Sequence, residues 1–225
     1  MNFSAVILAG GKSSRMGRDK GLLEVDGQSL LARQIKLVRA AGASEVFISG
    51  RTDNNYADFD CPVLLDRFPD SGPLSGIQAA LAIATTPRLL VLAVDMPLMK
   101  ASVFRSLLEH CTESAGAVPR VNRAIEPLTA FYPKAAASLA LELLNAQTGM
   151  PAANSRAERK TTSPYPARDG QDQGKQAVKF PSAKHFAECC IAAELATFVE
   201  LPAQHTHFFT NWNSPADIVG LSSIA

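Results

Sequence analysis

The sequence predicts a single α/β domain built on one doubly wound, mostly parallel sheet with helices on both faces. Apolar runs of strand length alternate with segments whose apolar residues recur at helical spacing. The strand-like runs are hydrophobic almost without interruption, which is typical of parallel strands covered on both faces. With 225 residues, of which 47% are hydrophobic, the chain can also bury one large core.

The first half of the chain shows this alternation most clearly. Strands are expected at 5–9, 45–49, 62–65 and 89–94, where the sequence reads AVILA, EVFIS, PVLL and LLVLAV. The apolar positions between these strands fall on single helical faces. They predict helices around three groups of residues: Leu31, Ile35 and Val38; Leu74, Ile77 and Leu81; and Val103, Phe104, Leu107 and Leu108.

The pattern changes after residue 114. Strand candidates at 115–120 and 126–132 are joined only by the short polar segment 121–125, so the sheet is expected to have an antiparallel member. Another helix is expected around Leu139 and Leu143, because these residues fall one turn apart.

Residues 149–181 have no hydrophobic periodicity and contain four prolines with a local excess of Lys and Arg. Structureless loops longer than about 12–15 residues are uncommon inside compact domains. We therefore expect one domain over 1–225 with a flexible insertion at 149–181, the alternative being a lid that orders on binding.

Regular structure is expected again over 182–201, where Phe186, Cys190 and Ala193 form an apolar helical stripe. The next segment, HTHFFTN at 205–211, is expected to be a strand, so that its two histidines point the same way. No carboxylate or cysteine near them completes a metal site, which favours a structural or surface role.

Composition excludes several classes of function. The 22 basic and 21 acidic residues leave a formal net charge of +1, so no overall field would attract nucleic acid or an anionic membrane. No run approaches the roughly 20 apolar residues that span a bilayer, and the N-terminus lacks a secretory signal, so we expect a cytoplasmic protein. The spacing of the four cysteines (Cys61, Cys111, Cys189 and Cys190) favours reduced, mostly buried thiols.

In an open α/β sheet, ligands bind beyond the carboxyl ends of the strands, so the residues that follow each strand are the first to inspect. The loop after the first strand lacks the glycine spacing of both the Walker A and the dinucleotide-binding motifs. It does contain the parts of a phosphate cradle: Gly10 and Gly11 allow close backbone approach, and Lys12, Arg15 and Lys20 supply positive charge. From composition alone, an ordinary glycine turn with solvated charges explains the loop equally well.

Two later strand exits also suggest binding. The segment DRFPDSGPLSGI at 66–77 opens a helix whose N-terminus can receive negative charge, although chain reversal alone would explain it. Asp95 emerges directly from the most hydrophobic strand, where an unpaired buried carboxylate would be costly. We therefore expect Asp95 to face a cleft and meet a cation or a donor, with a helix cap or turn as the alternative. The segment 213–217 is a good helix start, with Ser214 as N-cap and Pro215 at the first helical position. Asn211 and Asn213, just before that cap, could contact a ligand, but capping explains most of the segment.

Taken in order, the motifs LAGGKSSRMGRDK, GPLSGI, DMP, EPLTAFY and NWNSPAD resemble those of the molybdenum cofactor guanylyltransferases. These enzymes lie within a larger group of nucleotidyltransferases that have an N-terminal glycine-rich loop. The resemblance runs over about 4–147 and 182–220. It implies a Rossmann-like nucleotidyltransferase fold and transfer of GMP from GTP to the phosphate of the molybdopterin cofactor, with release of pyrophosphate.

The resemblance also implies roles for individual residues. Those implied in catalysis are Lys20, Arg15 and Asp95, with Mg²⁺ as the cofactor on Asp95. Those implied in nucleotide binding are Leu8, Ala9, Gly10, Gly11, Lys20, Asp66 and Asp95. Asn211 and Asn213 would contact the acceptor. The chain departs from the pattern at Ser49 and Gly50, where relatives often place an asparagine near the guanine.

Two alternatives remain. One is a cytidylyltransferase that acts on molybdopterin or on a sugar or polyol phosphate. The other is a non-catalytic nucleotide-binding regulator of cofactor assembly. In the leading interpretation, GTP and the molybdopterin cofactor are the substrates, and molybdenum-insertion proteins or the apoenzyme that receives the product are candidate protein partners.

Overall fold

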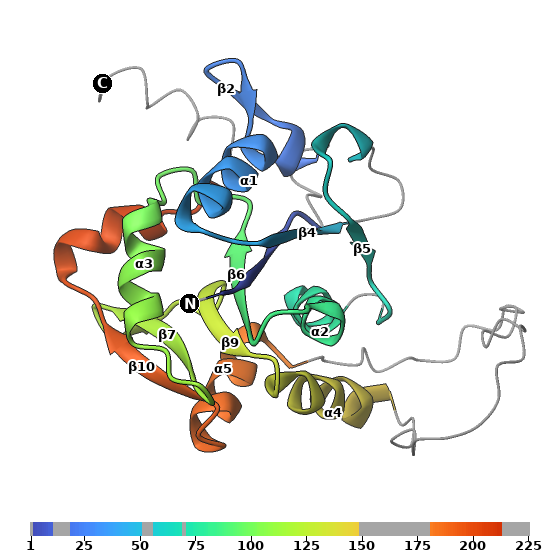
Figure 1. Ribbon diagram of the computed structural model, residues 1–225, viewed down its shortest axis with the longest axis vertical. Coiled ribbons are helices and arrows are strands. Elements are labelled where there is room, and N and C mark those ends of the chain that lie inside the picture. The colour runs from blue at the N-terminus through green and yellow to red at the C-terminus, as the bar shows by residue number, and fades with distance from the viewer. Residues whose placement is uncertain (1, 11–18, 51–55, 69–70, 149–180, 213–225) are drawn as a thin grey trace, which may run out of the picture.

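The computed structural model describes residues 2–10, 19–50, 56–68, 71–148 and 181–212. Its centre is a mixed sheet in the order β10-β7-β9-β6-β1-β4-β5, with β8 paired to β7 (Figure 1). The pairs β1–β4, β1–β6, β4–β5 and β7–β10 are parallel, whereas β9 runs antiparallel to β6 and β7. The predicted doubly wound, mostly parallel sheet with an antiparallel member is confirmed.

The strands follow the apolar runs to within a residue or two in the first half of the chain. They are β1 (Ser4–Leu8), β4 (Glu45–Gly50), β5 (Val63–Leu65), β6 (Arg88–Ala93), β7 (Gly116–Val121), β8 (Ala124–Ile125), β9 (Thr129–Pro133) and β10 (Ala196–Glu200). A separate hairpin, β2 (Glu24–Val25) and β3 (Gln28–Ser29), turns at Asp26 and Gly27, which both have positive φ, as a type I′ turn requires. This hairpin has no counterpart among the predicted elements.

In the described part of the chain, five α-helices cover the sheet: α1 (Leu30–Ala41), α2 (Pro73–Ile83), α3 (Ala101–Glu109), α4 (Ala136–Thr148) and α5 (Ala183–Ala192). Local chemistry fixes the ends of α1. The Ser29 hydroxyl accepts a hydrogen bond from the Ala32 amide at its start, and Gly42 takes a left-handed conformation at its end.

The sheet separates two hydrophobic clusters because successive strand residues point to opposite faces. Ala5 and Ile7 of β1 pack in the cluster that contains α1 and α3, whereas Val6 and Leu8 pack in the cluster that contains α2, α4 and α5. Figure 1 shows α1 and α3 on one side of the sheet and α2, α4 and α5 on the other. Burial on both faces explains why these strands contain so few polar residues.

The C-terminal part of the described chain confirms one prediction and corrects another. Regular structure does resume over 182–201: the apolar stripe of Phe186, Cys190 and Ala193 belongs to α5 and its C-cap, and Glu194 at φ 58° then turns the chain into β10. The expected strand at 205–211 is instead mostly the 3₁₀ helix η3 (Ala203–Phe209), in which the His205 amide bonds the Pro202 carbonyl. The strand alternation from which a common direction of His205 and His207 was expected is therefore absent from these residues, although both imidazole rings contact the ring of Phe208.

All four cysteines are free thiols; Cys111 and Cys190 are buried, and Cys61 and Cys189 are half-buried. Burial raises the pKa of Cys111 to about 11 and that of Cys190 to about 12, which keeps these thiols protonated.

The expected insertion at 149–181 lies outside the described residues except for its last position. Within the described chain, we find no helix with the length and apolar character needed to cross a membrane.

Candidate active site

The exits of three neighbouring parallel strands meet at one edge of the sheet. Leu8, the last residue of β1, lies opposite Ser49 of β4 and Ala93 of β6. Beyond the strands, the Val94 amide donates to the Leu8 carbonyl at 3.2 Å. The segments that follow β1 and β6 therefore leave the sheet side by side.

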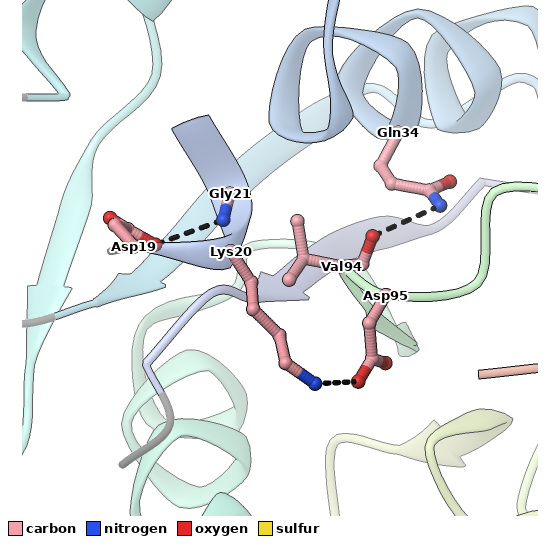
Figure 2. Close-up of polar contacts among 6 residues, drawn as sticks. All are labelled: Asp19, Lys20, Gly21, Gln34, Val94 and Asp95. Atoms are coloured by element: carbon pink, nitrogen blue, oxygen red, sulfur yellow. Dashed lines mark hydrogen bonds and ion pairs between the residues drawn. The ribbon is translucent and has the colours of Figure 1, made fainter. Parts of the chain in front are cut away.

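Lys20 and Asp95 form an ion pair at this edge. Lys20 Nζ lies 3.1 Å from Asp95 Oδ2, and the two side chains are 20% and 21% exposed (Figure 2). Lys20 opens the short 3₁₀ helix η1 (Lys20–Leu22), whereas Asp95 follows β6. The structure thus joins a cation and a carboxylate that the sequence placed in separate loops.

A cap fixes the turn that presents Lys20. Asp19 precedes η1, and its Oδ1 accepts a hydrogen bond from the Gly21 amide at 2.9 Å (Figure 2). Its other oxygen, Oδ2, accepts a hydrogen bond from the Tyr56 hydroxyl at 2.5 Å. Both carboxylate oxygens of Asp19 are therefore bonded.

The exit of β6 is fixed by contacts on either side of Asp95. The buried Gln34 amide of α1 donates to the Val94 carbonyl at 3.4 Å (Figure 2). It also donates to the Met96 carbonyl at 2.8 Å. The backbone amide of Trp212 donates to the Asp95 carbonyl at 2.9 Å. These bonds hold the peptide units around Asp95 and leave its carboxylate pointing toward Lys20.

The first loop is anchored to β4 through Ser49. Its carbonyl accepts hydrogen bonds from the Ala9 amide at 2.8 Å and the Gly10 amide at 2.9 Å. On the other face of β4, α2 approaches so closely that a Cβ on Gly76 would lie 2.1 Å from Ser49 Oγ. Close packing of α2 on Ser49 of β4 thus requires glycine at position 76.

The N-terminus of α2 lies beside the exit of β5. Asp66 follows β5 and is exposed, yet desolvation by neighbouring atoms raises its pKa, against the opposing effect of a hydrogen bond with Ser75. Gly72 immediately before α2 has φ 69° and ψ −155°, a backbone conformation essentially confined to glycine. Pro73 then occupies the first turn, where its missing amide hydrogen costs nothing.

The structure brings several of the predicted residues together. Leu8, Ala9 and Gly10 lie where β1 ends, next to Asp95, and Lys20 reaches the same place. Asn211 is exposed and directly precedes Trp212, whose amide bonds the Asp95 backbone. Asp66 belongs to the exit of β5, two strands away from β1 in the sheet.

Gly11, Lys12, Arg15 and Asn213 lie outside the described residues. The binding and catalytic roles of all the predicted site residues stay predictions.

Sequence reasoning did not single out Asp19, Tyr56 or Gln34. Tyr56 had a detectable signal, because it is a bulky aromatic residue in the polar stretch after β4. Asp19 resembles an N-cap, since aspartate often precedes a helical turn. Gln34 had none, because a glutamine inside an amphipathic helix is ordinarily exposed.

The donor chemistry of this site fits a magnesium ion that is shared with a nucleotide. Within the described residues, no group of three or more His, Cys, Asp or Glu side chains could form an all-protein metal site. Mg²⁺ is commonly held by one or two carboxylates together with substrate phosphates and water. Asp95 supplies one such carboxylate, beside the Lys20 ammonium.

An open cavity of about 540 Å³ adjoins the η1 turn. Its described lining consists of Asp19, Leu22, Leu23 and Glu24. Leu22, which is 42% exposed, gives the cavity an apolar wall beside Lys20 in the same turn.

The sequence of the chain is similar to those of known nucleotidyltransferases. Residues 5–160 match the family model of the MobA-like NTP transferase domain. A probable molybdenum cofactor guanylyltransferase from Opitutus terrae is 33% identical over 217 residues, which covers 95% of this chain and 92% of that protein. A molybdenum cofactor guanylyltransferase from Pseudomonas aeruginosa is 39% identical over 138 residues, covering 58% of this chain and 68% of that protein.

Solved structures show the same fold at lower sequence identity. The molybdopterin-guanine dinucleotide biosynthesis protein A from Archaeoglobus fulgidus superposes with a TM-score of 0.60 at 19% identity, covering 100% of this chain and 98% of that chain. The 2-C-methyl-D-erythritol 4-phosphate cytidylyltransferase from Thermus thermophilus gives a TM-score of 0.58 at 16% identity, covering 95% and 94%. The fold is therefore shared by proteins whose names specify different bases.

Proposed function

Because the chain belongs to the MobA-like NTP transferase family, we propose that it transfers GMP from GTP to the phosphate of the molybdopterin cofactor. An oxygen of the acceptor phosphate attacks the α-phosphorus of GTP and forms a new P–O bond. The bond between the α-phosphorus and the bridging oxygen breaks, and its electron pair leaves with pyrophosphate. The products are a guanine dinucleotide form of the cofactor and pyrophosphate.

The observation that supports this proposal most directly is the Lys20–Asp95 pair at 3.1 Å. Two anionic substrates repel each other, so the enzyme must align them and neutralise charge that develops on the phosphoryl oxygens. The Lys20 ammonium supplies a positive charge at the edge where the β1 loop ends. Asp95 would hold Mg²⁺, which supplies charge neutralisation and orientation of the triphosphate when bound.

The remaining predicted residues supply binding. Leu8, Ala9 and Gly10 would line the nucleotide site, and the bonds from the Ala9 and Gly10 amides to the Ser49 carbonyl hold this part of the loop against β4. Asn211 lies on the segment that Trp212 anchors to Asp95, which supports a role beside the acceptor. From the sequence, we also propose that Arg15 acts in catalysis, Gly11 binds the nucleotide and Asn213 contacts the acceptor. The expected cytoplasmic location and the protein partners that receive the product also stay predictions.

The identity of the transferred base, guanine or cytosine, is the point on which an alternative function differs. Ser49 Oγ lies against Gly76, so the Ser49 side chain is occupied by packing where relatives often place an asparagine near the guanine. A cytidylyltransferase with the same acceptor, or with a sugar or polyol phosphate, would use the same Lys20 and Asp95.

Turnover assays with GTP, CTP, ATP and UTP, each with molybdopterin and Mg²⁺, test the proposal. We expect pyrophosphate release and a guanine dinucleotide product with GTP. Activity with CTP alone would favour the cytidylyltransferase. Nucleotide binding without turnover of any of the four would favour the non-catalytic regulator.

A further inference from the structure

We propose that Tyr56 is a positioning residue for Lys20, acting through Asp19. The inference rests on the proposed function, because it concerns the residue that would contact the triphosphate. It adds a residue that does not touch substrate. The Tyr56 hydroxyl orients the Asp19 carboxylate, that carboxylate caps η1, and η1 directs the Lys20 ammonium toward Asp95.

The ring of Tyr56 has a fixed place. Tyr56 is only 2% exposed, and its ring contacts the ring of Phe59 edge-on with centroids 6.3 Å apart. Its ring also covers Gly50 at the end of β4, where a Cβ would lie 2.3 Å from Tyr56 Cε2. Only glycine at position 50 leaves room for the ring in this place. The hydroxyl is therefore carried by a side chain that β4 holds firmly.

The hydroxyl fixes the orientation of a carboxylate that is already engaged on its other side. Asp19 Oδ2 accepts from Tyr56 at 2.5 Å, a short charge-assisted bond, and Oδ1 accepts from the Gly21 amide at 2.9 Å. With both oxygens bonded, the carboxylate cannot rotate away from the cap. Asp19 thus connects β4 with the turn that carries Lys20.

The turn depends on this support because it is too short to be stable alone. η1 contains three residues, and the first turn of a helix is unfavourable before tertiary contacts stabilise it. Two backbone bonds close the turn itself, from the Leu22 amide to the Asp19 carbonyl and from the Leu23 amide to the Lys20 carbonyl, both at 3.2 Å. At the end of the turn, the Leu23 carbonyl accepts from the Leu30 amide at 2.9 Å. The side-chain cap and its tyrosine partner link the start of the turn to the sheet. Losing that link would displace the Lys20 ammonium rather than unfold the protein.

The Tyr56→Phe variant tests the position of the Lys20 ammonium without a large loss of fold stability. It keeps the ring over Gly50 and removes only the hydroxyl, which bonds a half-buried carboxylate that water can reach. We expect kcat with GTP to fall about ten- to hundredfold, since a displacement near 1 Å at a reacting site can cost about a hundredfold. The KM for molybdopterin should change little.

Thr86→Val is the matched control. Thr86 is 3% exposed, and its hydroxyl bonds Ser4 Oγ and the Arg88 carbonyl, both at 2.8 Å, at the end of β6 opposite Asp95. This variant loses a buried hydroxyl away from η1. It should lower the melting temperature at least as much as Tyr56→Phe does and leave kcat unchanged.

A double variant tests whether the two residues act as a unit. If Tyr56 acts through Asp19, then Tyr56→Phe combined with Asp19→Ala should lose no more kcat than Asp19→Ala alone. Losses that multiply would overturn the inference. So would a Tyr56→Phe enzyme with the kcat of the unmodified chain.

Hydrogen exchange at the Gly21 amide, followed by NMR without substrate, gives a readout that does not depend on activity. Tyr56→Phe should accelerate exchange at this amide several-fold, whereas Thr86→Val should not. An unchanged rate would refute the positioning role. If the unmodified chain turns over none of the four nucleotides, the proposed function fails, and the exchange experiment still decides whether Tyr56 orders η1.

Discussion

The Lys20 ammonium lies 3.1 Å from the Asp95 carboxylate, although 75 positions separate the two residues in the chain. An ammonium and a divalent cation are both attracted to this carboxylate, so Lys20 balances the charge of Asp95 when neither nucleotide nor metal is bound. Triphosphate binding would offer Lys20 new anionic partners and make Asp95 available to Mg²⁺. This arrangement favours joint binding of nucleotide and metal.

Lys20→Ala should therefore increase the affinity of the nucleotide-free protein for Mn²⁺, used as a probe for Mg²⁺. Removing a positive charge in contact with Asp95 should tighten binding about tenfold at low salt. Titration followed by electron paramagnetic resonance measures it. Lys36→Ala, at an exposed position on α1, is the control and should change nothing. Weaker Mn²⁺ binding by Lys20→Ala would contradict competition for Asp95.

Asp95→Asn should leave the fold largely intact and reduce turnover by about two to three orders of magnitude. The side chain is 21% exposed and keeps its shape, but the amide loses the charge that would hold a metal. Pyrophosphate release with GTP and Mg²⁺ measures the effect. Asp58→Asn, an exposed aspartate on η2 (Ala57–Phe59), is the control. Unchanged turnover would remove Asp95 from the proposed mechanism.

Gln34→Met should destabilise the fold by about 1–3 kcal/mol, because it leaves the carbonyls of Met96 and Val94 without their side-chain donor. Urea unfolding measures this change, and a fall in kcat would show that the exit of β6 has shifted. Gln78→Met is the matched control on α2. Gln78 Oε1 is buried and finds no hydrogen-bond partner in the described part of the chain, so its replacement should cost less. Equal losses for the two variants would argue against a special role for Gln34.

Glu126→Gln should stabilise the protein at neutral pH and have no effect in acid. Burial raises the pKa of Glu126 above its ordinary value of 4.5, so the folded protein holds this proton more tightly than the unfolded chain does. Stability is then lost as the pH rises from the ordinary value through the raised one. Melting temperatures at pH 4 and pH 7.5 measure the effect, with the exposed Glu142→Gln on α4 as the control. A variant that melts lower at pH 7.5 would contradict it.

The sequence predicted the sheet well where both faces are covered. In β1, β4 and β6 the need to bury both faces produces nearly continuous apolar runs, and their limits were correct to within two residues. It did not separate β10 from the helix before it, and the strand that it predicted at 205–211 was wrong. The stripe of Phe186, Cys190 and Ala193 has helical spacing, but β10 follows within a few residues and pairs with the distant β7. Pairing of that kind leaves no local signal.

The candidate site divides in the same way. Asp95 was predictable because a carboxylate directly after a buried strand requires a partner, and the glycines and cations of the first loop indicated anion binding by composition. The partner itself was not predictable, since the Lys20–Asp95 contact depends on two strand exits meeting at one edge. The Tyr56–Asp19 bond likewise depends on how β4 returns beside β1.

By itself, then, the sequence determined the type of fold, the strands of its first half and a set of charged residues at strand exits. Only the tertiary structure decided which of these residues meet, how Lys20 is supported through Asp19 and Tyr56, and how Gln34 and Trp212 hold the backbone around Asp95. The physical reason is that burial and helical spacing act on residues close in the chain and leave periodic patterns. Contacts between loops depend on the geometry of the assembled sheet, which no local pattern records.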